Sequence, residues 1–153
     1  MTSGTDKEVR LILRSVIQNL TEDGTPDGAP EQTRLTLPGR LCAEGDAVIL
    51  TYEEPGEGGT IHCRVTLRGD TVVVRRQGAV MCEMVFSPEE YRGIYEVPPY
   101  RFDMTVRTRK IRAALTPEGG ELDLFYSLTV GGAPKHVHLH LHTADEEACL
   151  GTC

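Results

Sequence analysis

The chain has 153 residues, and its 16 lysines and arginines against 23 aspartates and glutamates give a formal net charge of −7. Hydrophobic residues make up 39% of it, aromatic residues only 5%, and tryptophan is absent. This length predicts a single domain over residues 1–153 with a core of aliphatic side chains, and the acidic balance argues against a general nucleic-acid binder.

The cysteines and the hydropathy pattern predict where the protein is found. The cysteines are odd in number and no two have C-x-x-C spacing: Cys42, Cys63, Cys82, Cys149 and Cys153. A disulfide framework is therefore not expected. The first residues lack the apolar run of a signal peptide, and no stretch approaches the roughly 18 apolar residues of a spanning helix. We expect a cytoplasmic protein with reduced thiols and no membrane partner.

Alternating apolar and polar residues dominate the first half of the chain. In residues 9–17, Val9, Leu11, Leu13 and Ile17 share one face, which is typical of a strand with one buried side. Shorter strand candidates follow at 35–37, 48–52, 61–67, 71–74 and 79–86. Pairs containing glycine predict tight turns between strands: Gly45-Asp46, Gly58-Gly59, Gly69-Asp70, Gly119-Gly120 and Gly131-Gly132. Strands joined by such turns form an antiparallel meander.

Helix signals are few. Ser87, Pro88 and the glutamates after them have the pattern of a helix start, and Gly93 predicts that this helix ends within about two turns. Thr143 and Glu146 repeat the capping spacing. The second pattern predicts a short C-terminal helix or tail at about 144–153.

The longest strand candidate covers residues 100–115 and changes phase near its middle. Its apolar residues are even-numbered up to Val106 and odd-numbered from Ile111. A β-bulge between Arg107 and Lys110 would turn both apolar sets toward the same core. Residues 122–130 and 137–141 then alternate without interruption.

Nine or ten strand candidates, one of them long and bent, predict an all-β fold. We expect an antiparallel meander closed into a barrel of about 8–10 strands, with one or two short helices, because closure removes exposed sheet edges. A barrel of this size is either filled by its own side chains or holds one small ligand.

Several segments resemble a known family. Gln77-Gly78-Ala79-Val80 is followed by Phe86, then by GIYEVPPY at 93–100, TVRT at 105–108 and GELDLFYSL at 120–128. These segments resemble the YwiB-like family of small bacterial proteins, in order over roughly residues 9–143. The resemblance implies a calycin-like, lipocalin-like β-barrel whose biochemical role is uncharacterised, and it supplies no catalytic residues.

The sharpest local feature is a strand of alternating histidines, namely His136, His138, His140 and His142. On a strand all of them lie on one face, about 6.6 Å apart along the backbone. Two such imidazoles can share one metal ion, with a carboxylate or thiolate of an adjacent strand, such as Cys63 or Cys82, completing the ligands. The alternative interpretation is a solvent-facing row of histidines with Val137, Leu139 and Leu141 packed inward.

A second feature is local positive charge. Residues 101–115 contain Arg101, Arg107, Arg109, Lys110 and Arg112 against Asp103 alone, and Arg75 and Arg76 are possible neighbours. Such a strand can bind an anion or an RNA backbone. Few aromatic residues are present to stack on bases, however, and no nucleic-acid module is visible. Pairing with acidic neighbours is therefore the preferred interpretation, and nucleic acid is not the expected partner.

The preferred functional hypothesis is non-enzymatic binding of a small, partly apolar ligand inside the barrel. The predicted lining residues are Phe102, Met104, Val106, Leu124, Tyr126 and Leu128. No catalytic residue and no cofactor are expected, because Ser15, Ser87 and Ser127 lie in no Gly-x-Ser-x-Gly motif. The alternatives are a solidly packed barrel that meets a protein or RNA partner through the basic strand, and weak metal binding at the histidine strand. The sequence leaves the oligomeric state open.

Overall fold

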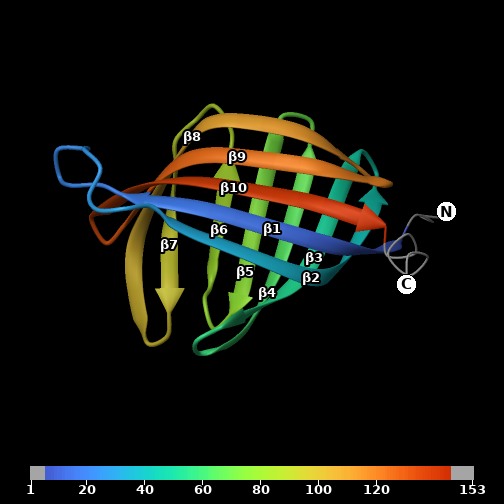
Figure 1. Ribbon diagram of the computed structural model, residues 1–153, viewed down its shortest axis with the longest axis horizontal. Coiled ribbons are helices and arrows are strands. Elements are labelled where there is room, and N and C mark those ends of the chain that lie inside the picture. Colours follow the sequence, from blue (N-terminus) through green and yellow to red (C-terminus); the bar gives the residue numbers. More distant parts are fainter. Residues whose placement is uncertain (1–5, 146–153) are drawn as a thin grey trace.

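The structure, a computed structural model, describes residues 6–145 and consists of strands and turns (Figure 1). The strands are β1 (Lys7–Asn19), β2 (Glu31–Glu44), β3 (Ala47–Gly56), β4 (Gly59–Arg68), β5 (Thr71–Gly78), β6 (Cys82–Phe86), β7 (Tyr91–Val97), β8 (Tyr100–Thr116), β9 (Gly119–Val130) and β10 (Ala133–Asp145). They form one antiparallel sheet in the order β6-β5-β4-β3-β2-β1-β10-β9-β8-β7.

The sheet curls until its two outer strands almost meet. β6 and β7 are joined by a single bridge, in which Met81 and Glu96 exchange backbone hydrogen bonds of 2.8 and 2.9 Å. The first and last strands, β1 and β10, pair side by side in the middle of the sheet (Figure 1). The result is a nearly closed barrel, as the meander pattern predicts.

Strand alternation places apolar side chains inside the barrel. Leu11, Leu41, Leu122, Leu124 and Phe86 are fully buried, and they belong to one contiguous core cluster that draws on nearly every strand. Because each buried leucine or phenylalanine contributes roughly 1.5–3 kcal/mol relative to exposure, this cluster is the main stabilising element of the fold.

The predicted β-bulge in β8 is confirmed. The register between β8 and β9 shifts between Thr108 and Lys110. Val106 pairs with Leu128 before the shift and Ile111 pairs with Leu124 after it. The extra residue therefore keeps both apolar sets on the inner side of the barrel, where Val106 is fully buried and Ile111 packs against the core.

The predicted helices are wrong where they can be compared. The Ser87 hydroxyl does accept a hydrogen bond from the Glu89 amide, at 3.3 Å, but the chain only bends there and enters β7 at Tyr91. Pairing of β7 with β8 outweighs a helix of so few residues. Thr143 lies in β10, and residues 146–153 of the predicted C-terminal helix are outside the described part. Residues 6–145 include no helix that could cross a membrane.

The predicted turns are correct at Gly45-Asp46, Gly69-Asp70 and Gly131-Gly132 and displaced at the other glycine pairs. At the β8–β9 hairpin the turn residues are Pro117 and Glu118, and Gly120 already lies in β9. Gly120 has a φ of +139°, and a Cβ there would overlap the carbonyl oxygen of Ala114. The glycine is thus required by close strand contact as well as by its backbone conformation.

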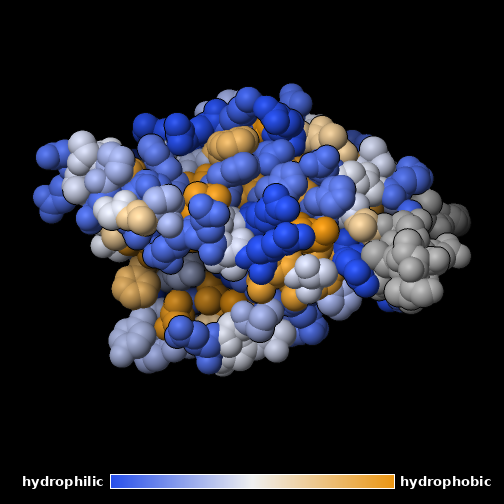
Figure 2. Space-filling model, viewed as in Figure 1, coloured by the Kyte–Doolittle hydropathy of each residue, from blue (hydrophilic) through white to orange (hydrophobic). Residues whose placement is uncertain are grey.

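The barrel is open along part of β2. This strand pairs with β1 from Glu31 to Leu41 but with β3 only from Gly39 to Glu44. Residues 31–38 of β2 therefore have a neighbouring strand on one side only. Hydrophobic side chains are visible in a hollow below this part of β2 (Figure 2).

Candidate functional site

The histidines of β10 lie on the outer side of the barrel, as predicted. Val137 and Leu141 are buried on the inner side and Leu139 packs against the core. The four imidazoles are half-buried and face away from the core. The alternation of β10 thus satisfies both interpretations of the sequence up to this point, and the neighbours of the imidazoles decide between them.

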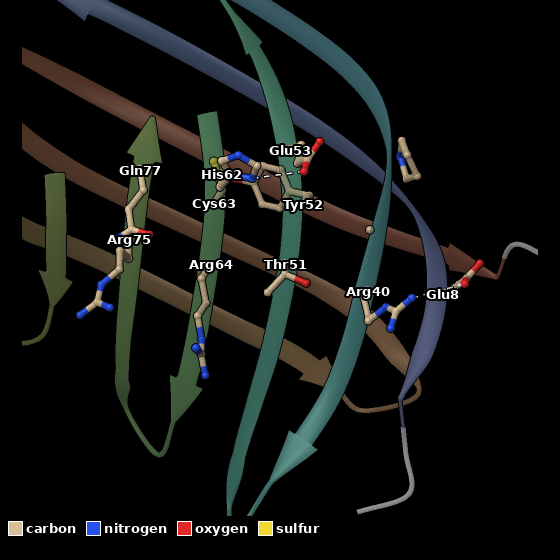
Figure 3. A pocket seen from close by; sticks show the side chains of 12 residues that line it. Glu8, Arg40, Thr51, Tyr52, Glu53, His62, Cys63, Arg64, Arg75 and Gln77 are labelled. Carbon is tan, nitrogen blue, oxygen red and sulfur yellow. Dashed lines mark ion pairs between the residues drawn. The ribbon is translucent and has the colours of Figure 1, made fainter. Parts of the chain in front are cut away.

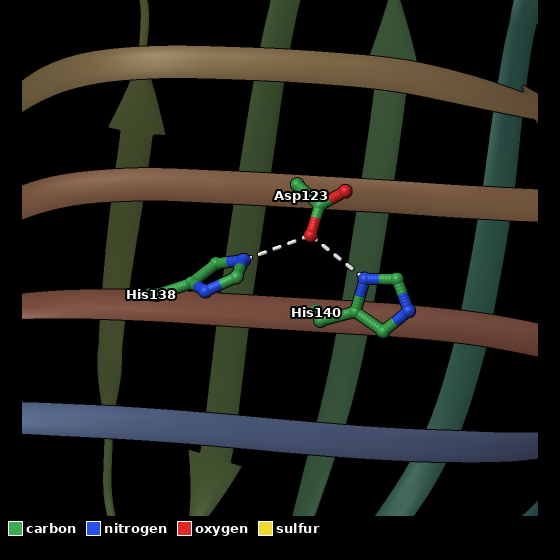
Figure 4. Close-up of side chains that lie close together, drawn as sticks. All are labelled: Asp123, His138 and His140. Atoms are coloured by element: carbon green, nitrogen blue, oxygen red, sulfur yellow. Dashed lines mark hydrogen bonds and ion pairs between the residues drawn. The ribbon is translucent and has the colours of Figure 1, made fainter.

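Two of the imidazoles converge on a carboxylate of β9 (Figure 4). Oδ1 of Asp123 lies 2.8 Å from Nε2 of His138 and 2.7 Å from Nδ1 of His140. These atoms all lie within 4.8 Å of one another, close enough to serve as ligands of one metal ion. Asp123 comes from β9, whose residue 123 is the Cα partner of His140.

The Asp123 carboxylate faces outward and is nevertheless only 8% exposed. Burial by itself raises the pKa of Asp123, but the hydrogen bonds from His138 and His140 outweigh burial and lower the pKa below its usual value. Because an ionised carboxylate only accepts hydrogen bonds, Nε2 of His138 and Nδ1 of His140 must both carry protons. A metal ion would take the place of these two protons.

Neighbouring side chains fix the two rings. The His138 ring stacks on Phe125 with centroids 4.0 Å apart and planes inclined by 15°, and the Lys110 ammonium lies 6.0 Å from the Phe125 centroid. Nε2 of His140 lies 3.4 Å from a carboxylate oxygen of Glu121. This second carboxylate orients the free nitrogen of His140, as outer partners of metal-binding histidines commonly do.

The other residues predicted for a metal site do not join it. His136 and His142 lie outside the Asp123 cluster, and burial together with the nearby Arg109 lowers the pKa of His136. Cys63 and Cys82 are buried in the core, on strands β4 and β6. Asp123 was not among the residues predicted for a metal site. A two-residue turn at Gly131-Gly132 places His140 opposite Asp123. The position of this turn in the sequence could therefore have predicted the pairing of these two residues.

The predicted barrel lining is largely correct in position. Met104, Val106, Leu124 and Tyr126 are buried in the core, and Leu128 is half-buried at its edge. Phe102 departs from the prediction, because it is 40% exposed. It is the third residue of β8, and its ring lies beside Gly131 in the β9–β10 turn. The inner side chains pack on one another in a single cluster.

One charged pair points into the barrel. The Arg76 guanidinium lies 3.1 Å from a carboxylate oxygen of Glu54, and both side chains are about one-fifth exposed, at 20% and 22%. Burial by itself lowers the pKa of Arg76, but the Glu54 carboxylate outweighs burial and raises it. Burial also raises the pKa of Tyr126. Among the described residues, the interior therefore combines an apolar core with one ion pair, whose Arg76 was predicted to lie beside the basic strand.

Half of the remaining cations of the basic cluster are paired. Arg101 pairs with Glu96, Arg107 with Glu90 and Arg75 with Glu83. Within the described residues, Arg109, Lys110 and Arg112 have no acidic partner. Pairing with acidic neighbours, the preferred interpretation of this cluster, therefore accounts for most of it.

Two of the hollows on the outer face of the barrel bear on function. The larger, about 660 Å³, crosses β2 to β5, where Arg40, Thr51, Arg64 and Arg75 stand in one row (Figure 3). Glu53 and His62, 3.1 Å apart, lie beside that row. The smaller, about 500 Å³, crosses β10, β1 and β2 and includes His138 and His140. The candidate metal ligands are thus reached from an open groove.

Comparison with known proteins agrees with the fold. The family described as a domain of unknown function, DUF1934, matches residues 17–141. The uncharacterized β-barrel protein YwiB of Bacillus subtilis (strain 168) is 24% identical over 131 residues, covering 85% of this chain and 87% of YwiB. The crystal structure of the B. subtilis ywiB protein matches with a TM-score of 0.78 at 20% identity, covering 92% of this chain and 94% of that chain. The resemblance to the YwiB-like family is confirmed.

Proposed function

Because the chain belongs to the DUF1934 family, whose description names no activity, its function must be inferred from its own side chains, and we propose that it binds a divalent transition-metal ion through Asp123, His138 and His140. The observation that carries the proposal is the convergence of two imidazoles on one buried carboxylate. Two imidazoles and a carboxylate are ligands that suit zinc, with a fourth position left for water or a ligand.

The geometry favours one ion at this place. Zinc binds nitrogen and oxygen at about 2.0–2.2 Å, so the three side chains need only small rotations to surround an ion. Both imidazoles sit on one rigid strand and the carboxylate on its hydrogen-bonded neighbour, and sites on paired strands hold their geometry better than sites on loops. The stacked Phe125 and the Glu121 carboxylate further restrict the rings.

Metal titration with matched histidine variants tests the proposal. Cobalt(II) absorption and zinc calorimetry on the full chain should give one ion per chain. His138→Ala, His140→Ala and Asp123→Asn should each weaken binding by about tenfold or more, the effect expected when a ligand is lost. His136→Ala and His142→Ala are the controls, since they remove imidazoles of the same strand outside the cluster, and should keep affinity within about twofold. Equal uptake by all five variants would refute the proposal.

A second candidate function is binding of a small, partly apolar ligand beside the β7–β8 hairpin of the barrel. The observation that favours it is a group of exposed apolar side chains on the β7–β8 hairpin. Val97 is 38% exposed, Tyr100 65% and Phe102 40%. Contiguous exposed apolar surface commonly marks a ligand or interaction site, and here it lies beside the hollow below β2 (Figure 2).

Native mass spectrometry of the protein purified from its own host is the direct test of this candidate. A co-purifying organic molecule that Phe102→Ala releases would support it. Ile94→Ala is the matched control, because Ile94 is also exposed, at 39%, but projects from the other face of β7. A protein free of organic ligand, with equal binding of a fluorescent apolar probe by both variants, would remove the candidate.

We further propose that binding occurs without catalysis and in the cytoplasm. Cys42, Cys63 and Cys82 are free thiols, as in a reducing compartment. Burial raises the pKa of Cys63 and of Cys82, so both thiols stay protonated and are poor nucleophiles. Their Cα atoms are two strand spacings apart, about 9.6 Å, which is too far for a disulfide. If either thiol reacted with a maleimide faster than free cysteine does, the proposal that these thiols are poor nucleophiles would be contradicted.

A further inference from the structure

Two arginines face each other on the outer side of β1 and β2. Arg14 of β1 and Arg34 of β2 are direct Cα partners, and Arg14 is also the Cα partner of His140 on β10. Both arginines line the groove that contains His138 and His140. The row Arg34, Arg14, His140 and Asp123 therefore runs straight across four neighbouring strands.

Neither arginine is neutralised by an acidic side chain of the described residues. Most other arginines of this acidic protein are paired: Arg40, Arg68, Arg75, Arg76, Arg92, Arg101 and Arg107 all have a carboxylate within 4 Å. Like charges directly opposite each other on neighbouring strands destabilise a sheet. The pair Arg14 and Arg34 thus concentrates positive charge at a cost to stability, without any partner from the described chain.

The groove between these residues has the size and chemistry of a small-molecule site. Its volume of about 500 Å³ falls within the usual range for ligand pockets. Gln32 adds an amide at one end, and Val16 adds an apolar surface between Gln32 and His138. Two guanidinium groups side by side match the oxygens of a phosphate, each through two parallel hydrogen bonds. Hydrophilic side chains predominate over this face of the molecule (Figure 2).

We propose that the groove across β10, β1 and β2 binds a small phosphate-type oxyanion, inorganic phosphate or a phosphate monoester, through Arg14 and Arg34. The inference does not depend on the metal site, since the two guanidinium groups bind the anion without it. It also resolves a conflict, because these cations would repel a metal ion at Asp123, His138 and His140 unless an anion accompanied it. The organic group of a monoester can lie over Val16, on the His138 side of the groove.

Calorimetric titration of the full chain with inorganic phosphate and with phenyl phosphate tests the proposal. The titrations are made at low ionic strength, with a chelator present to remove metal ions. Saturable binding of one anion per chain is expected. Arg14→Gln and Arg34→Gln should each weaken it by about tenfold or more, as the loss of a charged hydrogen-bond pair implies. Tighter binding of phenyl phosphate would identify an esterified ligand, and equal binding a free anion; both results support the oxyanion site.

Arg64→Gln is the matched control. Arg64 is exposed, is the Cα partner of Arg75, and lacks an acidic partner among the described residues, but it lies in the other groove. Its loss should change phosphate affinity by less than about twofold. Arg34→Gln should also melt at the same temperature as the native chain or higher, because repulsion is relieved. Absence of saturable binding, or equal weakening by all three variants, would overturn the proposal.

Discussion

At the scale of single residues, Asp123 shows how an outward-facing side chain can become buried. Its strand position points it to the outer surface, yet His138 and His140 cover it from the next strand. An anion removed from water needs hydrogen-bond donors, and the two ring N–H groups supply them. The ionised carboxylate is therefore more favourable in the folded chain than in the unfolded chain, which links folding to pH.

The first prediction concerns that linkage. Hydrogen bonds from the histidines lower the pKa of Asp123 in the folded state, so its stabilising effect is present above the unfolded pKa of about 4 and disappears as the pH falls through the lower folded value. Asp123→Asn should reduce the free energy of unfolding by about 1–3 kcal/mol at pH 7. The difference from the native chain should shrink as the pH falls below about 4 and through the folded pKa of Asp123, as measured by urea unfolding.

Glu121→Gln provides the comparison for this prediction. The Glu121 side chain belongs to the same strand and approaches His140, but it is 55% exposed. Its removal should cost at most about 0.5 kcal/mol. A constant difference between Asp123→Asn and the native chain from pH 7 to pH 3 would show that Asp123 is not held ionised by its neighbours.

At the scale of elements, β8 is the strand that changes phase within the barrel. It pairs with β7 along its first part and with β9 along most of its length. The register shift between Thr108 and Lys110 gives the strand one extra residue. Without it, a strict two-residue period would turn one of the two apolar sets toward solvent.

The second prediction is that β8 tolerates substitution at the bulge but not deletion. Arg109→Ala should change the free energy of unfolding by less than about 0.5 kcal/mol, because the side chain is exposed. Deletion of Arg109 should expose the set that contains Met104 and Val106 or the set that contains Leu115, at a cost of at least about 4 kcal/mol. Thermal unfolding of the two variants measures the difference, and equal stability would mean that the bulge does not set the register.

At the scale of the whole molecule, the interior formed by residues 6–145 is an apolar core with one ion pair. Arg76 follows Val72 and Val74 on the inner side of β5, and Glu54 meets it from β3. Removal of one member of such a pair leaves a charge without a partner, whereas replacement of both by apolar residues is often neutral. The two outcomes can be compared directly in this barrel.

The third prediction follows from that asymmetry. Glu54→Gln should lower the free energy of unfolding by about 3 kcal/mol, and the double variant Glu54→Leu with Arg76→Met should recover most of the loss. The control is Glu83→Gln, which breaks the exposed pair with Arg75 on the other side of the same strand and should cost at most about 1 kcal/mol. A smaller cost for Glu54→Gln than for Glu83→Gln would show that the inner pair is effectively solvated.

The sequence predicts the barrel well because strand alternation and glycine turns are local signals. The phase change at 107–110 even locates the bulge. β7 was missed because Ser87, Pro88 and Glu89 form a strong local helix-start signal, which pairing with β8 overrides. Phe102 is exposed and Arg76 forms an inward ion pair because of where the barrel ends. The end of the barrel is set by the closed sheet as a whole, so local sequence patterns do not predict it. The Asp123 cluster requires the register between two strands, which only the turn specifies.

The half-paired part of β2 also bears on how molecules of this protein meet one another. Residues 31–38 leave one row of backbone amides and carbonyls available, and such a row can recruit a strand from a second molecule and begin aggregation. Charged Glu31 and Arg34 lie along this margin, and Pro38, which has no amide hydrogen, closes it. The side chains along this margin therefore oppose self-assembly at the unpaired part of β2.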